Sequence, residues 1–142
     1  MKLEGERLAG RLFETLARLT ADPPGVTRAA YGAGEQLAHD QLAAAATAIG
    51  LGVTTDAAGN LYMTQTGRDR SAPGLFIGSH LDTVPHGGNY DGAAGVIAGV
   101  AALAILAETG QSPAQDVTVM AIRAEEAAWF PLSYLGSKAA LG

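Results

Sequence analysis

Residues 75–107 read LFIGSHLDTVPHGGNYDGAAGVIAGVAALAILA. The segment begins with a short apolar run, 75–78, whose flanking turn residues predict a strand buried on both faces. It ends with a run, 93–107, that is apolar almost throughout and predicts a buried helix, too short and too rich in glycine to span a membrane. Gly95 and Gly99 lie four residues apart on one face of this helix, where we expect close approach to a sheet. A glycine-rich polar loop therefore joins a strand directly to a helix.

A second apolar run, 117–122, follows this helix and is rich in β-branched residues, so it predicts another strand. A strand, a helix and a strand in this order form a crossover, which makes the two strands parallel and brings their carboxyl ends to the same sheet edge. His80 follows the first strand, and Glu125 and Glu126 follow the second. We expect these side chains to meet at the edge where open α/β sheets bind ligands.

The remaining segments extend this α/β pattern. Leucines at helical spacing predict an amphipathic helix over 8–19, and an alanine-rich run predicts a second helix over 35–49. Two short strand-like runs, 53–55 and 61–65, flank turn-forming residues and predict a hairpin. The length of 142 residues and a hydrophobic content of 48% indicate a single domain.

Charge and cysteine content exclude several kinds of partner. The 14 acidic and 9 basic residues give a net charge of -5 without any basic cluster, so we expect neither nucleic-acid nor membrane binding. The absence of cysteine excludes disulfides and thiolate zinc sites, which leaves His and carboxylates as metal ligands. Residues 1–7 carry charges where an export signal needs an apolar core, so we expect a cytoplasmic protein.

The polar residues at the predicted sheet edge suit a divalent metal ion. His80, Asp91 and Glu126 offer an imidazole and two carboxylates, a donor set that binds Zn²⁺ or Mn²⁺. Asp82 lies two residues beyond His80 and can accept the second imidazole N–H, which would fix the tautomer of the ring. Glu125 is expected to point away from its neighbour and is the candidate general base.

Each of these features has a structural interpretation when it is taken alone. A His-x-Asp pair in a loop is structural more often than functional, and two adjacent Glu residues are commonly a solvated strand end. Asp91 also suits the N-cap of the helix that follows it. The metal-site interpretation is favoured because all three features converge on one sheet edge.

Three other polar residues are not expected to act in the site. His39 lies on the predicted second helix, where a lone histidine is most often a surface or packing residue. His86 is interpreted as a loop or substrate-side residue rather than a ligand. Ser79 adjoins His80, but adjacent side chains cannot form the relay of a hydrolytic triad.

Residues 78–85, 87–92 and 123–126 together resemble the hydantoinase/carbamoylase family of amidohydrolases, in the dinuclear zinc-exopeptidase superfamily. This group includes N-carbamoyl-L-amino-acid hydrolases, β-ureidopropionases and allantoate amidohydrolases. The similarity covers essentially the whole chain, including 56–61 and 135–137. It implies a three-layer αβα sandwich with a mostly parallel mixed sheet of the zinc-exopeptidase type.

The resemblance also implies a site and a reaction. Two divalent ions, zinc or manganese, would be bound with His80 on one ion, Asp91 bridging both and Glu126 on the other. Glu125 would be the catalytic acid/base. With Glu125 we count Asp82 among the catalytic residues, because it can accept the imidazole N–H of His80. The implied reaction is hydrolysis of a linear carbamoyl or amide C–N bond in a small-molecule ureido or amide substrate, such as an N-carbamoyl-L-amino acid.

Members of the family are much longer and supply further metal ligands from later sequence. Residues 127–130 read AAWF, where many relatives have a small residue, Ser, Arg and Phe. We therefore expect residues 1–142 to be the N-terminal portion of a catalytic domain with an incomplete sheet and without the dimerisation (lid) domain.

Two interpretations of the chain follow. In one, further sequence or a partner chain completes an active enzyme, either an amidohydrolase or a peptidase or deacylase of the same superfamily. In the other, the chain is a truncated, non-catalytic remnant that self-associates into a homo-oligomer through an exposed sheet edge. In both cases the isolated 142 residues are expected to be inactive or weakly active.

Overall fold

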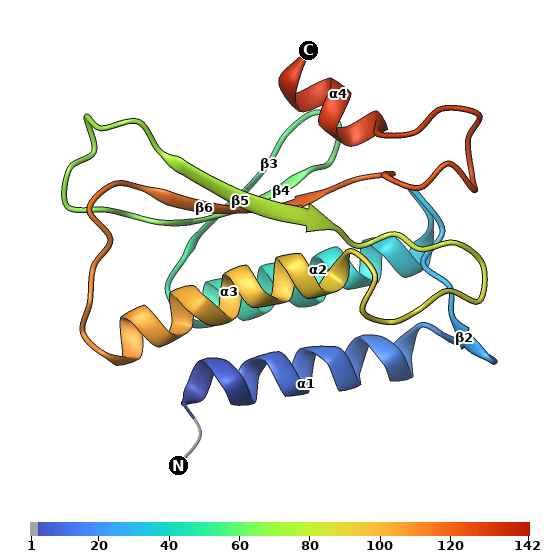
Figure 1. The fold of residues 1–142 in the computed structure, drawn as a ribbon, viewed down its shortest axis with the longest axis horizontal. Coiled ribbons are helices and arrows are strands. Elements are labelled where there is room, and N and C mark those ends of the chain that lie inside the picture. The colour runs from blue at the N-terminus through green and yellow to red at the C-terminus, as the bar shows by residue number, and fades with distance from the viewer. Residues whose placement is uncertain (1–2) are drawn as a thin grey trace.

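The computed structural model describes residues 3–142 (Figure 1). Met1 and Lys2, the start of the charged segment that argued against an export signal, lie outside the described residues. The elements in chain order are α1 (Glu4–Leu19), β1 (Ala21–Asp22), β2 (Gly25–Val26), α2 (Ala33–Ala48), β3 (Gly52–Thr55), β4 (Leu61–Gln65), β5 (Leu75–His80), α3 (Ala93–Glu108), β6 (Val117–Ile122) and α4 (Leu135–Leu141). The predicted helices and strands are all present, while the short β1–β2 ribbon and α4 were not predicted.

The main sheet is mixed, with the strand order β3-β4-β6-β5. The crossover prediction is confirmed, since β5 and β6 pair in parallel through α3 and His80 lies opposite Ile122. The other two pairs, β3 with β4 and β4 with β6, are antiparallel. The mixed α/β class is thus confirmed, but parallel pairing is limited to one pair. The short turn after β3 returns the chain as a hairpin, which accounts for the antiparallel pairing of β3 with β4.

Helices cover the sheet unequally. α1, α2 and α3 lie on one face and α4 on the other, which gives the helix–sheet–helix order with one short helix in the second layer (Figure 1). α2 and α3 pack on the sheet, and α1 packs mainly on α3. The core between them is formed by fully buried aliphatic side chains, among them Leu16, Leu42, Met63, Val96 and Val100. Throughout residues 3–142, every helix falls short of the length and apolar character that a bilayer crossing requires.

Two glycines bring α3 close to the sheet, as predicted. A Cβ on Gly95 would lie 2.8 Å from Cβ of Ser79, and one on Gly99 would lie 2.9 Å from Cγ1 of Val119. These distances are shorter than real Cβ contacts, so larger residues would force the helix away from β5 and β6. The close packing holds the first turn of α3 against the end of β5.

The prediction that β5 is buried on both faces was wrong. Leu75, Phe76 and Ile77 are 48%, 59% and 37% exposed. β5 is an edge strand of the described sheet, and the second face carries only the short α4 (Figure 1). An apolar run alone does not show whether both faces of its strand are covered.

Candidate metal centre

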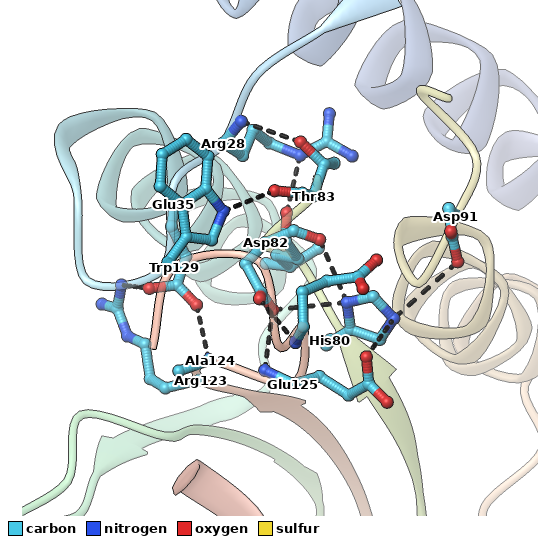
Figure 2. Close-up of polar contacts among 12 residues, drawn as sticks. Arg28, Glu35, His80, Asp82, Thr83, Asp91, Arg123, Ala124, Glu125 and Trp129 are labelled. Atoms are coloured by element: carbon cyan, nitrogen blue, oxygen red, sulfur yellow. Dashed lines mark hydrogen bonds and ion pairs between the residues drawn. The ribbon is translucent and has the colours of Figure 1, made fainter. Parts of the chain in front are cut away.

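The carboxyl ends of β5 and β6 bring the predicted site residues together. His80 is the last residue of β5, Asp91 precedes the first turn of α3, and Glu125 and Glu126 follow β6. His80 and Asp91 face each other across the end of the sheet, with Glu125 beside them (Figure 2). The convergence that we expected from the crossover is therefore present.

Three of these residues form a group with suitable donor atoms. One donor atom from each of His80, Asp91 and Glu126 lies within 4.8 Å of the other two. The edge of a tetrahedral zinc site with ligands at about 2.1 Å is shorter, about 3.4 Å. Small side-chain rotations can close this difference, because the Asp91 side chain is 65% exposed. The donor set and its spacing fit a divalent ion, although the role of each residue as a ligand stays a prediction.

His80 is oriented by its neighbour, as we expected. Its Nδ1 lies 3.0 Å from the carbonyl oxygen of Asp82 and 3.3 Å from Oδ1 of the same residue. Nδ1–H therefore donates to Asp82, and this leaves the lone pair of Nε2 facing the carboxylates. Nε2 lies 3.8 Å from Oδ1 of Asp91 and 3.6 Å from Oε2 of Glu125.

Gly92 lies against the same imidazole ring. It has a φ of 65°, and a Cβ at this position would lie 2.5 Å from Cε1 of His80. Gly92 is also the N-cap of α3, and among the described residues no side chain caps this helix. The N-cap interpretation of Asp91 was therefore wrong, and the carboxylate of Asp91 is left free to face His80.

Asp82 connects the two strand ends. Its side chain is fully buried, and its two carboxylate oxygens accept the backbone N–H of Glu125 at 3.1 Å and of Glu126 at 3.0 Å. Burial would raise the pKa of Asp82, but the hydrogen bonds from His80 and from the two amides lower it below its usual value. One carboxylate therefore fixes both His80 and the backbone that carries the two glutamates.

The group carries an excess of negative charge. Burial, together with the negative charges of Glu125, Asp91 and Asp82, raises the pKa of Glu126. Burial lowers the pKa of His80, but the hydrogen bond and charge of Asp82 outweigh it and the net shift is upward. In this group the four carboxylates of Asp82, Asp91, Glu125 and Glu126 outnumber the one imidazole of His80. A divalent cation would supply the missing charge.

A buried ion pair behind the glutamates was not predicted. Glu35, fully buried on α2, accepts the Ala124 N–H at 3.0 Å and the Arg123 Nη1 at 3.1 Å. Burial raises the pKa of Glu35 despite these hydrogen bonds. Ala124 has a φ of 50°, and this unusual conformation immediately precedes Glu125. The only sequence signal was a carboxylate on the apolar second helix.

Two segments that carried the resemblance also meet here. The amide of Asn60 donates to the carbonyl oxygen of Gly136 at 2.9 Å, and its Oδ1 accepts the Arg123 N–H at 2.8 Å. A Cβ on Gly136 would lie closer than 2.5 Å to both Asn60 and Arg123. The turn after β3 and the start of α4 thus hold the end of β6 in place.

The remaining histidines lie outside the group. His86 is exposed, and its Nδ1 is 3.0 Å from the carbonyl oxygen of Asp22, so it belongs to the loop beside the β1–β2 ribbon. His39 is 3% exposed, and neither ring nitrogen has a hydrogen-bond partner among residues 3–142. Burial lowers its pKa to about 3, which makes it a neutral packing residue at pH 7.

Both the sequence and the structure of this chain are similar to those of known hydrolases. A sequence profile described as peptidase family M28 matches residues 60–141. N-carbamoyl-L-amino-acid amidohydrolase of Paenarthrobacter aurescens is 37% identical over 99% of this chain and 34% of its own length. Allantoate amidohydrolase of Bacillus subtilis is 35% identical over 88% of this chain and 31% of its own length.

Solved structures show the same relationship. A hydantoinase/carbamoylase family amidase from Burkholderia ambifaria superposes with a TM-score of 0.89 and 35% identity, over 96% of this chain and 34% of that protein. The resemblance inferred from the sequence motifs is thereby confirmed. The chain spans about a third of the length of the curated relatives that it matches.

Proposed function

The chain belongs to peptidase family M28, and from this premise we propose that it forms part of the active site of a metal-dependent amidohydrolase. The proposed reaction is hydrolysis of the linear C–N bond of an N-carbamoyl-L-amino acid or a related ureido compound. Relatives with N-carbamoyl-L-amino-acid and allantoate amidohydrolase activity in their names support this substrate class. The substrate is a small molecule, and we expect neither nucleic acid nor a membrane as a partner.

The observation that carries the proposal is the donor group of His80, Asp91 and Glu126, which lies within 4.8 Å at the sheet edge. His80, Asp91 and Glu126 are the residues that would hold the divalent ions, with His80 and Glu126 as ligands of different ions and Asp91 as a ligand of both. Zinc and manganese both accept such nitrogen and oxygen donors. Divalent ions supply Lewis acidity, which polarises a carbonyl group and acidifies water.

The residues of this chain supply positioning and proton transfer. Glu125 lies beside His80 without being needed as a ligand, so we assign it the role of acid/base. In the ionised form its carboxylate takes a proton from the attacking water, and it then returns the proton to the leaving nitrogen. Asp82 acts indirectly, because it orients His80 and holds the backbone amides of both glutamates.

Turnover is proposed to need groups beyond the described residues. Two tetrahedral ions have about eight coordination positions. His80, Asp91 and Glu126 would provide only part of the ligands that two such ions need. We therefore propose that residues 1–142 are the N-terminal portion of a catalytic domain, and that additional sequence or a partner chain supplies the other ligands. The isolated chain should bind metal and show little or no turnover.

Peptide hydrolysis is the second candidate, because the family profile that matches residues 60–141 is that of a peptidase. The same residues would act in the same roles on a peptide bond. Comparing ammonia release from N-carbamoyl-L-amino acids with amine release from dipeptides, in the protein with its additional ligands supplied, separates the two activities.

Metal binding by the 142-residue chain tests the site itself. We expect Zn²⁺ to bind the wild type, and we expect His80→Ala to weaken binding at least tenfold. His86→Ala is the matched control, since His86 is exposed and bonded to Asp22 away from the group. Equal affinity in wild type and His80→Ala, or no Zn²⁺ binding by the wild type, would contradict the proposed site and favour the non-catalytic remnant.

A further inference from the structure

Arg28 is a buried cation that is neither a proposed metal ligand nor the proposed acid/base. It lies between β2 and α2, and its side chain belongs to the largest fully buried side chains of the protein. Its guanidinium donates from Nε to the carbonyl oxygen of Leu81 at 2.6 Å. It also donates from Nη1 to Oδ1 of Asn89 at 3.1 Å and from Nη2 to the carbonyl oxygen of Asn89 at 3.2 Å.

All three acceptors are neutral, which is unusual for a buried arginine. Within residues 3–142 no carboxylate lies close enough to form an ion pair with Arg28, whereas the other buried arginine, Arg123, pairs with Glu35. Burying a charge without a counter-ion is costly unless the surroundings compensate for it. Burial lowers the pKa of Arg28, while the charges of Asp82 and Asp91 oppose this shift. Arg28 therefore interacts electrostatically with the carboxylates of the proposed metal site without forming an ion pair with any one of them.

The acceptors of Arg28 lie on the two segments that carry the proposed ligands. Leu81 directly follows His80, and Asn89 lies two residues before Asp91. The main chain of Arg28 reinforces the first connection, because its N–H donates to Oγ1 of Thr83 and its carbonyl accepts the N–H of Thr83, each at 2.9 Å. Figure 2 shows Arg28 beside Thr83, behind Asp82 as seen from His80.

We propose that Arg28 is a positioning residue of the metal site: its guanidinium fixes the spacing between the segment of His80 and the segment of Asp91. This inference rests on the proposed function. It requires the planar fork of arginine, which can donate to Leu81 and Asn89 at the same time. The single ammonium of a lysine keeps the charge but cannot span both acceptors.

The test measures Zn²⁺ affinity of the 142-residue chain by competition with a chromophoric chelator, at a temperature where every variant is folded. We expect Arg28→Met to weaken binding at least tenfold and Arg28→Lys to weaken it by a smaller factor. Asn89→Ala removes one acceptor and leaves the arginine in place, so it should weaken binding in the same direction and serves if Arg28→Met does not fold.

Leu103→Ala is the control for lost stability. Leu103 is 2% exposed and lies in the C-terminal half of α3, away from the site, so this variant should lower the melting temperature and change Zn²⁺ affinity less than twofold. Unchanged affinity in Arg28→Lys and Asn89→Ala, with a wild type that binds Zn²⁺, would overturn the positioning role alone. A wild type that binds no Zn²⁺ would instead overturn the proposed function on which this role rests.

Discussion

Replacing Asp82 by Asn should destabilise the protein strongly, although it changes only one atom of the side chain. The buried carboxylate of Asp82 accepts the amides of Glu125 and Glu126. Asn retains one acceptor oxygen but places an NH₂ donor against one of these N–H groups. A hydrogen bond to a charged group contributes about 1.5–3 kcal/mol, and a buried donor without a partner costs about 1–3 kcal/mol. We therefore expect a loss of about 3 kcal/mol in the free energy of unfolding.

Urea denaturation of the metal-free protein at pH 7 measures this loss, and Asp40→Asn serves as the control. Asp40 is exposed on α2, so its substitution should change stability by less than about 0.5 kcal/mol. In a thermal melt, a loss of 3 kcal/mol corresponds to a decrease of about 10 °C for a chain of this size. Zn²⁺ affinity should also fall, because the backbone that carries Glu126 loses its support.

The pH dependence gives an independent check. The pKa of Asp82 is lower in the folded state than its usual value of 3.8, so its stabilising contribution is complete above that value. It is lost as the pH falls through the lower, folded-state pKa. The difference in free energy of unfolding between wild type and Asp82→Asn should therefore be constant near neutral pH and should decrease in strong acid. A difference below about 0.5 kcal/mol at pH 7 would refute the role assigned to Asp82.

Three further predictions concern other positions. Gly92→Ala should abolish measurable Zn²⁺ binding, because the new Cβ would lie 2.5 Å from the His80 ring. Gly88→Ala is the control and should bind Zn²⁺ like the wild type, because a Cβ on Gly88 meets no heavy atom within 4 Å. Equal Zn²⁺ affinities of the two variants would contradict this prediction. Burial lowers the pKa of His39 from its ordinary value of 6.5 to about 3, so lowering the pH favours the unfolded state of the wild type. Between pH 7.5 and pH 5, the free energy of unfolding of the wild type should fall by about 2 kcal/mol relative to that of His39→Leu, as measured by urea denaturation. Parallel curves of stability against pH would disprove this prediction. Trp129 is the only tryptophan, and its Nε1 donates to the carbonyl oxygen of Thr83, beside the proposed site, at 2.7 Å. Its fluorescence should therefore change during Zn²⁺ titration with the same midpoint as direct binding. Unchanged emission would argue against a coupling between Trp129 and the site.

The parts of the fold that could be predicted depend on local pattern and chain connectivity. The apolar runs before His80 and before Arg123 were sufficient to place two strands, and the helix between them was sufficient to make those strands parallel. Parallel strands end at one edge, so the meeting of His80 with Glu126 followed from connectivity alone. Their approach to within 4.8 Å agrees with that reasoning.

The supporting residues could not be predicted because their contacts cross long sequence separations. Arg28 reaches Asn89 across 61 residues, and Glu35 reaches Ala124 across 89. Nothing in the local sequence distinguishes a buried arginine in a loop from an exposed one. The exposure of Phe76 was missed for a related reason, since it depends on which elements cover the second face of the sheet.

The central claim is that His80, Asp91 and Glu126 bind divalent metal, and anomalous diffraction tests it most directly. Crystals of the 142-residue chain would be soaked in Zn²⁺, and anomalous differences would be collected on both sides of the zinc absorption edge. We predict an anomalous peak at about 2.0–2.2 Å from Nε2 of His80 and from a carboxylate oxygen of Asp91. A peak only at His86, or the absence of any peak beside His80 at saturating Zn²⁺, would contradict the proposed site.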